Sequence, residues 1–580
     1  MRRILIFCHY NKHNNLSDHV LYTLSHIKHI YNRIVFVSNS GIDVEKQAII
    51  RNYCDDIQLR ENKGYDFGAW KDALLKEGWD KLSEYDNLTL MNDTCFGPLY
   101  DLEPLYTQME AKDIDFWGLT DHYGLTTRIS GKKISIPPHI QSYFICFKNV
   151  VIKSLFFRKL WKNVKYEKKV ETVISKYETR LTALLKKNGF TCSSVLKAHN
   201  EVNISIKSPD LCIINSIPFI KVKSFLYFPY PEFIQQLIHD KTDYPVSLIA
   251  DHLSDIYDPS ISFTTTNKIF IPESRPVNKS FIPQPKIAIH LHIFYLDIFE
   301  KYAATFDEWT VEYHLYITTD TLEKKQAIID CFKNHPSYKN LEEIILFENH
   351  GRDILPWLSI SDKLETYDIV GHFHTKKTIN ANPSVGMLWQ QDLLDSLLLP
   401  VNAIIDIFNT NKKIGIIIPD IPRHFQSNPL ISSHEKKLGI LMNNLWKNMD
   451  CKKNIDFLEL TAFVFPYGNM FWYRPSALRP LFILKPETMD IPKEPLPDNS
   501  ILHCLERMLV YIAWSEGFDF LISARSVPQV SSFHANYVLN KYVNNYIKEY
   551  ENSKSYRIGR LILTVPRLIK IYTAKLYKKR

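Results

Sequence analysis

The feature that most constrains the fold of this 580-residue chain is an internal duplication. Residues 61–70 read ENKGYDFGAW and residues 348–357 read ENHGRDILPW, so Glu, Asn, Gly, Asp and Trp recur at identical offsets. In both places a Tyr-Asp pair leading into an apolar run follows, at residues 85–86 and 367–368. A pattern repeated in this way predicts two copies of one fold in tandem.

The sequence on either side of the two motifs keeps the same order. Each half opens with an apolar segment, continues with a second that runs into small polar residues, and closes with a Glu placed a fixed distance before a Gly. Agreement at so many ordered points indicates common descent of the two halves. The matching points are residues 3–10 and 286–292, residues 34–40 and 314–320, and the pairs Glu178–Gly189 and Glu506–Gly517.

The boundaries of the halves follow from composition. Residues 271–285 are rich in Pro and polar side chains, which predicts a linker. We therefore expect a first domain at residues 1–270, a second at residues 286–545 and a separate C-terminal segment at residues 546–580.

Within each half, apolar runs of strand length alternate with segments of helical periodicity. This alternation predicts an α/β fold with a mainly parallel sheet covered by helices on both faces. Ligands bind such sheets at the carboxyl ends of the strands. The polar residues that follow the strands are therefore the candidates for a binding site.

In the first half, Asp93 comes directly after the apolar strand at residues 88–91. It can hold Mg²⁺ or Mn²⁺ bridging a diphosphate, because these cations prefer one or two carboxylates together with phosphate oxygens. Asn92 and Asp93 can equally cap the following turn. The set predicted to bind a nucleotide ligand in this half comprises His9, Tyr10, Asn62, Gly64, Asp66 and Asn92.

The second half has no acid where Asp93 stands in the first. Asp353, like Asp66, can either cap a helix or contact the ribose or base of a nucleotide. His372 and His374 alternate along a strand, so they can bind a metal, contact phosphate together with lysine, or be solvated. The predicted ligand-binding set of this half comprises Asn349, Gly351, Arg352, Asp353, His372, His374 and Lys376.

An aromatic segment at residues 465–474 offers rings that suit the apolar faces of sugars, although core packing is the more usual role of any one such ring. The segment at residues 139–144 occupies the corresponding place in the first half. The residues predicted to bind an acceptor are Tyr467, Asn469, Trp472 and Gln141.

A predicted helix places His503, Glu506 and Arg507 three and four residues apart. A carboxylate there can act as a general base on a hydroxyl group, or it can form a structural pair with the arginine. The residues predicted to be catalytic are Asp93, Glu178, His503 and Glu506.

Composition bounds the class of protein. Lys and Arg total 71 against 63 Asp and Glu, a net charge of only +8, so we expect no nucleic-acid partner. Nine scattered cysteines without a CxxC pair argue against a zinc ribbon or disulfide scaffold and favour a reducing cytosol.

No stretch approaches the roughly 18 apolar residues that span a bilayer. The basic segment at residues 556–580 predicts an amphipathic helix lying on an anionic membrane, or one packed on the body of the protein.

In these motifs the chain resembles the rhamnan synthesis protein F family of bacterial cell-wall and capsular polysaccharide synthesis. The resemblance implies two tandem GT-A-like (Rossmann-like) glycosyltransferase domains. It also implies transfer of L-rhamnose from dTDP-L-rhamnose to a lipid-linked rhamnose polysaccharide at the cytoplasmic face of the cell membrane, alongside other polysaccharide-synthesis enzymes. The stretches that match are ENKGYDFGAWKDAL, LMNDTCFGPL, HIQSYF, ENHGRDILPW, GHFHTKKT, WQQDLLDSLL, FPYGNMFWYRPSAL and HCLERM.

Two hypotheses stay open at this point. In the first, the chain transfers rhamnose or the sugar of another nucleotide, and the first half holds the donor with the help of a divalent cation. In the second, the chain binds or assembles glycans without catalysis and keeps degenerate transferase domains. The second hypothesis is motivated by missing acidic residues. GT-A enzymes commonly present Asp-x-Asp at the strand end, whereas this chain has Asn92-Asp93-Thr94 in the first half and His372-Phe373-His374 in the second.

Overall fold

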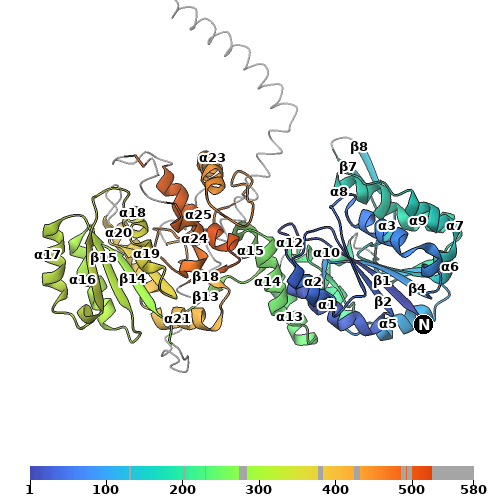
Figure 1. Cartoon of the computed structure of the whole chain (residues 1–580), viewed down its shortest axis with the longest axis horizontal. Coiled ribbons are helices and arrows are strands. Elements are labelled where there is room, and N and C mark those ends of the chain that lie inside the picture. The colour runs from blue at the N-terminus through green and yellow to red at the C-terminus, as the bar shows by residue number, and fades with distance from the viewer. Residues whose placement is uncertain are drawn as a thin grey trace, which may run out of the picture. The chain divides into compact units, whose positions relative to one another are not determined.

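A computed structural model gives the structure of the chain, and the two compact units into which it divides are drawn in Figure 1. The first unit contains residues 1–257 and 264–267, and the second contains residues 258–263 and those from 268 onward. The structure describes residues 1–129, 132–199, 203–228, 230–272, 284–376, 383–422, 432–460, 462–484, 491–492 and 500–524.

The first unit is built on a mainly parallel sheet. Its strands are β1 (Arg3–His9), β2 (Arg33–Ser38), β3 (Asp56–Leu59), β4 (Asn87–Asn92), β6 (Phe116–His122), β10 (Phe144–Lys148) and β11 (Cys192–Leu196). They are hydrogen-bonded in the order β11-β6-β10-β4-β1-β2-β3. Within this order β10 runs antiparallel to both of its neighbours, while β4, β1, β2 and β3 are mutually parallel.

Helices cover both faces of this sheet because its central strands are apolar on both sides. Along β1, Leu5 and Phe7 point into one core, whereas Ile4, Ile6 and Cys8 point into the other. The helices α1 (Asp18–Ile27), α5 (Glu103–Glu110), α13 (Pro231–Lys241) and α14 (Val246–Ile256) contribute to the first core. The helices α3 (Tyr65–Glu77), α7 (Leu155–Lys162) and α9 (Thr179–Lys187) contribute to the second.

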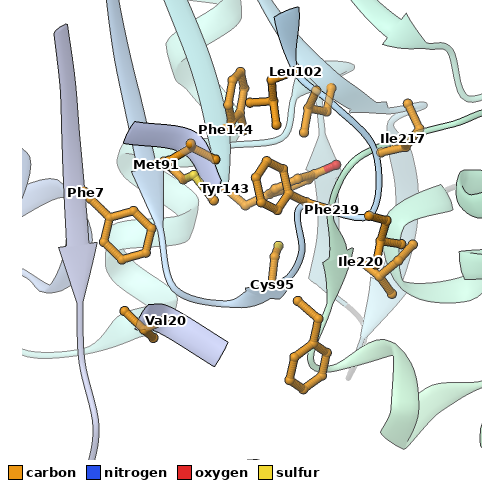
Figure 2. Close-up of a cluster of buried hydrophobic side chains, with 14 of the residues drawn as sticks. Phe7, Val20, Met91, Cys95, Leu102, Tyr143, Phe144, Ile217, Phe219 and Ile220 are labelled. Carbon is orange, nitrogen blue, oxygen red and sulfur yellow. The ribbon is translucent and has the colours of Figure 1, made fainter. Parts of the chain in front are cut away.

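Part of the first core, drawn in Figure 2, positions a short strand beside the end of β4. Phe144 of β10 stacks on Phe219 with 6.1 Å between ring centroids, and Ile220 is buried next to it in sequence. Ile220 opens β12 (Ile220–Lys221), which pairs with β5 (Cys95–Phe96) so that Lys221 faces Cys95. The packing of Phe219 and Ile220 therefore fixes the position of a lysine close to the carboxyl end of β4.

The second unit is built on a sheet of the same kind. Its strands are β13 (Ile269–Phe270), β14 (Ile287–His292), β15 (His314–Thr319), β16 (Leu341–Leu346), β17 (Ile369–His374), β18 (Ile414–Pro419), β19 (Phe471–Tyr473) and β20 (Asp519–Ser523). They follow the order β13-β20-β18-β19-β17-β14-β15-β16, in which β19 is antiparallel to β17 and β18. Its larger helices are α16 (Leu296–Asp307), α17 (Leu322–Phe332), α20 (Pro383–Leu393), α21 (Val401–Thr410), α23 (Ser432–Asn448) and α25 (Ile501–Ser515).

The two sheets have the same strand order, so the mixed α/β architecture predicted from the duplication is confirmed. From the edge inward, β3-β2-β1-β4-β10-β6-β11 in the first unit corresponds to β16-β15-β14-β17-β19-β18-β20 in the second. Only β13 is added, at the far edge of the second sheet. The register agrees as well, because Cys8 lies opposite Asn92 and His292 lies opposite His374.

The turn of the repeated motif has nearly the same backbone conformation in both units. Gly64 and Tyr65 have φ angles of 73° and 55°, and Gly351 and Arg352 have φ angles of 75° and 55°. Two successive left-handed residues reverse the chain sharply between β3 and α3 and between β16 and α18 (Ile354–Leu358), at the start of each helix. The turn delivers the next residue, an aspartate in both copies, to the carboxyl edge of the sheet.

The second duplicated spacing, from Glu to Gly, ends a helix in each unit. Gly189 and Gly517 have φ angles of 89° and 86°, as expected of a residue that terminates a helix in the left-handed conformation. The amide of the residue after each glycine donates to a carbonyl five residues earlier, from Phe190 to Leu185 and from Phe518 to Ala513. The spacing is therefore set by the length of helix that leads into β11 or β20.

The two units differ from the predicted domains in one region. Residues 258–263 and 268–270 belong with the second unit, the latter because β13 pairs with β20, whereas the sequence placed both stretches in the first domain. Most of the predicted linker at residues 271–285 lies outside the described residues. The predicted C-terminal amphipathic helix at residues 546–580 lies outside them as well.

Among the described residues, no single helix is long and apolar enough to cross a bilayer. The segments Gly386–Leu398 and Val401–Thr410 meet the requirements of length and composition only as a pair, with a bend of 45° between them. Leu397, Ile404 and Phe408 from these segments are buried in a core of the second unit.

The left-handed turn of the repeated motif gives a testable prediction. A Cβ atom added at Gly351 would lie 2.2 Å from Cγ of Leu355, whereas one added at Gly517 would meet nothing within 4 Å. Gly517→Ala should lower the free energy of unfolding by about 1–2 kcal/mol through backbone strain alone. Gly351→Ala should lower it by roughly 1–3 kcal/mol more, because the core must also shift. Urea unfolding of the two variants measures the difference, and equal losses would contradict the steric account.

Candidate functional site

The carboxyl edge of the first sheet brings together three of the predicted residues. The side-chain amide of Asn92 donates to Oδ2 of Asp66 at 3.1 Å. The backbone amide of Tyr10 donates to Oδ2 of Asp93 at 2.8 Å, and the amide of Asp93 donates to the carbonyl of Cys8 at 3.0 Å. The ends of β1 and β4 and the start of α3 thus place two carboxylates and an amide in one cluster.

The carboxylates of this cluster lack a compensating cation. Burial and the nearby charge of Glu178 raise the pKa of Asp66 to about 6. Burial, together with the charge of Asp66, raises the pKa of Asp93 to about 7. Within the described residues, neither aspartate forms an ion pair with a lysine or an arginine, although the charge of Lys221 partly offsets that of Asp66. The site is therefore electrostatically incomplete when both carboxylates are ionised.

This arrangement fits a divalent cation. Two carboxylates that repel each other in a partly buried site favour either a proton or a cation, and Mg²⁺ and Mn²⁺ prefer such oxygen ligands. Asp66 and Asp93 would supply the carboxylate oxygens, while Asn92 and the Tyr10 amide hold them in place.

Of the remaining predicted residues of the first unit, His9 lies beside Asp93. His9 shares a hydrogen bond from Nδ1 with Oγ of Ser38 at 2.9 Å, and its Nε2 lies 3.9 Å from Oδ2 of Asp93. Burial, and secondarily His19, lowers the pKa of His9 to about 3, so the ring is neutral and does not balance the aspartates. The side chains of Tyr10 and Asn62 are exposed at the rim.

The second unit places Asp353 where the first has Asp66, but surrounds it differently. Oδ2 of Asp353 accepts a hydrogen bond from the side-chain amide of Asn469 at 2.5 Å. It also lies 3.4 Å from Nε2 of His372 and 3.8 Å from Nε2 of His374. Burial by itself would raise the pKa of Asp353, but the combined effect of His374, His372 and Asn469 holds it well below its usual range. Because burial also lowers the pKa of His372, the protein stabilises this carboxylate through hydrogen bonds from Asn469 and His372 rather than through a fixed positive charge.

The neighbours of Asp353 continue inward as a chain of buried polar side chains. Nδ1 of His372 shares a hydrogen bond with Nδ1 of His290 at 2.9 Å. Nε2 of His290 and Nδ1 of His292 each lie 2.9 Å from Oγ1 of Thr318. Burial lowers the pKa of His290 and of His292, which favours neutral rings inside the sheet.

His290, His292 and Thr318 were not among the predicted residues, although His-Leu-His in β14 has the same alternation as His-Phe-His in β17. Because the strands pair in matching register, His290 and His372 occupy the places that Ile6 and Leu90 fill in the first unit. Positions that hold aliphatic side chains in the sheet of the first unit thus hold hydrogen-bonded histidines in the sheet of the second.

The predicted Asp93 has no acidic counterpart in the second unit, and the structure identifies its replacement. The amide of Thr375 donates to the carbonyl of His292, as that of Asp93 does to Cys8. Oγ1 of Thr375 accepts hydrogen bonds from the amides of Phe294 and Tyr295 at 2.9 and 3.0 Å. A hydroxyl therefore takes over the loop-holding role of the carboxylate without its charge.

A lysine joins the cluster of the second unit. Nζ of Lys376 lies 4.0 Å from the ring centroid of Trp389. Burial lowers the pKa of Lys376, and the charges of Glu506 and Asp353 act against this. Glu506 and Lys376 therefore approach the same site as Asp353. The side chains of Arg352 and Asn349 are exposed next to it.

Two predictions for the acceptor-binding residues are corrected by the structure. Trp472 is fully buried in β19, and its indole N–H donates to the carbonyl of Leu397 at 2.8 Å, so it belongs to the core. Gln141 is buried with both ends engaged, its oxygen by Thr120 at 2.7 Å and its nitrogen by Asn203 at 3.0 Å. The alternation of β19 and internal hydrogen bonding, which local sequence does not reveal, place these side chains inside.

The other two predicted acceptor-binding residues are also buried, and of these Asn469 contacts Asp353. The ring of Tyr467 stacks on Phe465 with 4.4 Å between centroids. Asn469 has a positive φ of 53° and directs its amide at Asp353. The loop before β19 thus completes the surroundings of Asp353.

The two predicted catalytic residues of α25 both have structural contacts, one as a helix cap and the other in an ion pair. His503 caps the start of α25, with Nδ1 2.8 Å from Oγ of Ser500. Glu506 lies 3.5 Å from the guanidinium of Arg507, the structural pair that the sequence offered as the alternative to a general base. In the first unit Glu178 precedes α9 and acts electrostatically on both Asp66 and His122.

Comparison with known families gives one match that covers most of the chain. The model of the family described as Rhamnan synthesis protein F matches residues 34–518, which confirms the resemblance drawn from the motifs. The uncharacterized protein WxcX of Xanthomonas campestris pv. campestris is 29% identical over 241 residues, covering 39% of this chain and 31% of that protein. The virulence protein VirA of Vibrio anguillarum is 28% identical over 214 residues, covering 34% of this chain and 62% of that protein. The matches thus span less than two thirds of each relative.

Solved structures give weaker likenesses. The glycosyltransferase GlyE of Streptococcus pneumoniae matches with 13% identity and a TM-score of 0.25, covering 65% of this chain and 86% of that chain. A 4-diphosphocytidyl-2C-methyl-D-erythritol synthase also matches with 13% identity and a TM-score of 0.25, covering 37% of this chain and 98% of that chain. Both scores are too low to bear on the fold or the function.

The contrast between Asp66 and Asp353 gives a prediction of opposite sign at equivalent positions. At pH 8, Asp66→Asn should raise the free energy of unfolding by about 1 kcal/mol, because it removes an uncompensated charge. Asp353→Asn should lower it by about 3 kcal/mol, because it disrupts a compensated buried carboxylate. Urea unfolding measures both changes.

The same pair predicts a dependence on pH. The raised pKa keeps the carboxyl group of Asp66 protonated in the folded chain up to about pH 6, whereas the unfolded chain ionises near its ordinary value. Stability is therefore lost as the pH rises from about 4 to 6, and the gain from Asp66→Asn should disappear toward pH 4. If both variants lost stability equally at pH 8, the two carboxylates would not differ as described.

Proposed function

The chain belongs to the rhamnan synthesis protein F family, and from this membership and the site we propose that it is a glycosyltransferase of polysaccharide synthesis. The family match runs through both units, each of which we take to be a GT-A-like domain. The proposed donor is dTDP-L-rhamnose, and the proposed acceptor is a lipid-linked rhamnose polysaccharide. Because that acceptor is held in the membrane, the protein is proposed to act at the cytoplasmic face with other enzymes of the same synthesis.

The observation that carries the proposal is the pair of uncompensated carboxylates, Asp66 and Asp93, at the carboxyl edge of the first sheet. A divalent cation at this point would neutralise the diphosphate of a nucleotide sugar and stabilise its departure. Asn92 orients Asp66, and the amide of Tyr10 orients Asp93. Lys221, which the sequence analysis did not single out, is close enough to Asp66 to add a positive charge beside the phosphates.

The proposed transfer needs a group that accepts a proton. The acceptor hydroxyl oxygen forms a bond to the anomeric carbon of the sugar as the bond from that carbon to the diphosphate breaks, and the nucleoside diphosphate leaves. The hydroxyl proton passes to a carboxylate acting as general base. Glu178 is our candidate for this base, because its side chain is partly exposed and its charge already reaches Asp66.

The second unit is proposed to bind its ligand without a divalent cation. Asp353 is compensated by His372, His374 and Asn469, and Thr375 takes the place of Asp93. Lys376 supplies a positive charge that suits a phosphate or a sugar bearing one. This unit would hold the growing glycan while the first unit holds the donor.

A non-catalytic role is the second candidate, and the replacement of the acid by Thr375 is the observation that favours it. If both units were degenerate transferase domains, the chain would bind oligosaccharide but not a nucleotide sugar. Isothermal titration with dTDP-L-rhamnose and with a rhamnose oligosaccharide separates the two roles.

The catalytic prediction is tested by release of dTDP from dTDP-L-rhamnose in the presence of a rhamnosylated lipid acceptor and Mg²⁺ or Mn²⁺. Asp93→Asn and Glu178→Gln should each lower kcat by at least about a hundredfold, because they remove a cation ligand and the general base. Glu506→Gln, the matched change in the second unit, should lower kcat by less than about tenfold.

Two outcomes would count against this assignment. A large loss with Glu506→Gln and none with Asp93→Asn would place catalysis in the second unit. No release of dTDP with either cation, combined with binding of oligosaccharide alone, would support the non-catalytic role.

A further inference from the structure

A second group of potential ligands lies in the second unit, at the edge of the sheet where strands begin. Glu300 is carried by α16, Cys331 by the last turn of α17, and His335 by the segment between α17 and β16. Figure 1 shows α16 and α17 next to each other, and the two helices are in contact. Since the candidate functional site occupies the opposite, carboxyl edge, this group has no part in it.

The three side chains converge on one point. Sγ of Cys331 donates to Oε2 of Glu300 at 3.0 Å, and Nε2 of His335 lies 3.3 Å from Oε1 of Glu300. One sulfur, one nitrogen and one carboxylate oxygen all lie within 4.8 Å of one another. Cys331 and His335 are four residues apart at the end of a helix, so both can face α16.

The ring of His335 is held in the orientation that a metal ligand needs. Its Nδ1 lies 2.6 Å from Oδ2 of Asp307, at the end of α16. Oδ1 of Asp307 accepts hydrogen bonds from the backbone amide and the hydroxyl of Ser337, at 2.9 and 2.5 Å. Asp307 accepts the hydrogen bond from the Nδ1–H of His335 and so leaves Nε2, which faces Glu300, as the nitrogen that a metal would bind in exchange for a proton, as in the carboxylate–histidine–zinc arrangement of known metal sites.

The carboxylate of Glu300 has no competing role. Its side chain is 66% exposed, and in the described part of the chain it forms no ion pair with a lysine or an arginine. It is therefore free to turn toward an ion from solvent, while Cys331 and His335 are partly buried and less mobile.

We propose that Glu300, Cys331 and His335 form a binding site for Zn²⁺ that ties α16 to the end of α17. A thiolate, an imidazole and a carboxylate are ligands that zinc accepts in tetrahedral sites, and the thiol group excludes a preference for Mg²⁺ or Ca²⁺. Binding forms bonds from zinc to sulfur, nitrogen and oxygen, the thiol proton and the Nε2 proton of His335 pass to solvent, and nothing is oxidised or reduced. The fourth position faces solvent and takes a water molecule.

Direct titration tests this proposal on the full-length chain after treatment with a chelator. Zn²⁺ is titrated in competition with a chromophoric chelator, and Co²⁺ is titrated with absorption spectra recorded in the near ultraviolet. We expect one ion bound with a thiolate-to-cobalt charge-transfer band. Cys331→Ser should abolish that band and weaken zinc binding by at least a hundredfold. Asp307→Asn, which removes only the orienting carboxylate, should weaken binding by roughly 10–100-fold.

Two controls keep the outcome interpretable. Cys451→Ser changes another partly exposed cysteine of the same unit and should leave both the band and the affinity within about twofold of the unchanged chain. Glu300→Gln alters a side chain that is 66% exposed, and urea unfolding of this variant separates its expected tenfold or greater loss of zinc affinity from any loss of stability. Ions bound at Asp66 and Asp93 would persist in Cys331→Ser. Absence of the charge-transfer band, or unchanged zinc affinity in Cys331→Ser, would overturn the proposal.

Discussion

Both candidate sites are organised around an aspartate that follows two left-handed residues. The turns at Gly64-Tyr65 and Gly351-Arg352 have nearly the same φ angles, and each places its aspartate against the end of the central strands. Because glycine makes the first left-handed step of this turn without the strain that another residue would carry, the backbone sets the position of Asp66 and Asp353. The rest of each site is determined by what the neighbouring strands present to that carboxylate.

The same backbone supports two opposite electrostatic solutions. In the first unit, Asp66 meets a further carboxylate, and the cluster attracts a cation. In the second unit, His372 and Asn469 surround the equivalent aspartate, so the protein itself supplies the compensation. His372 and His290 behind it replace aliphatic residues of the sheet, and they require a continuous chain of partners because buried polar groups without hydrogen bonds are destabilising.

Much of the fold follows from the sequence, and less of the site does. The duplicated ENxGxD pattern and the Glu-to-Gly spacing predicted two copies of one α/β unit, and the identical strand orders confirm that both halves share their topology. The cluster of Asp66, Asn92 and Asp93 could also be predicted from the sequence, because parallel strands end at a common edge of the sheet. The burial of Trp472 and Gln141 could not be predicted, since the direction in which these side chains point depends on strand register and on partners distant in sequence.

The sequence by itself determined where the glycine turns, apolar strands and helix ends lie, because these depend on local backbone conformation and on the alternation of apolar residues. Only the tertiary structure decided which charges meet. Lys221 approaches Asp66 through the pairing of β12 with β5, and His290 reaches His372 through the pairing of β14 with β17. The electrostatic character of a site is set by such contacts between distant segments, and no local pattern encodes their distances.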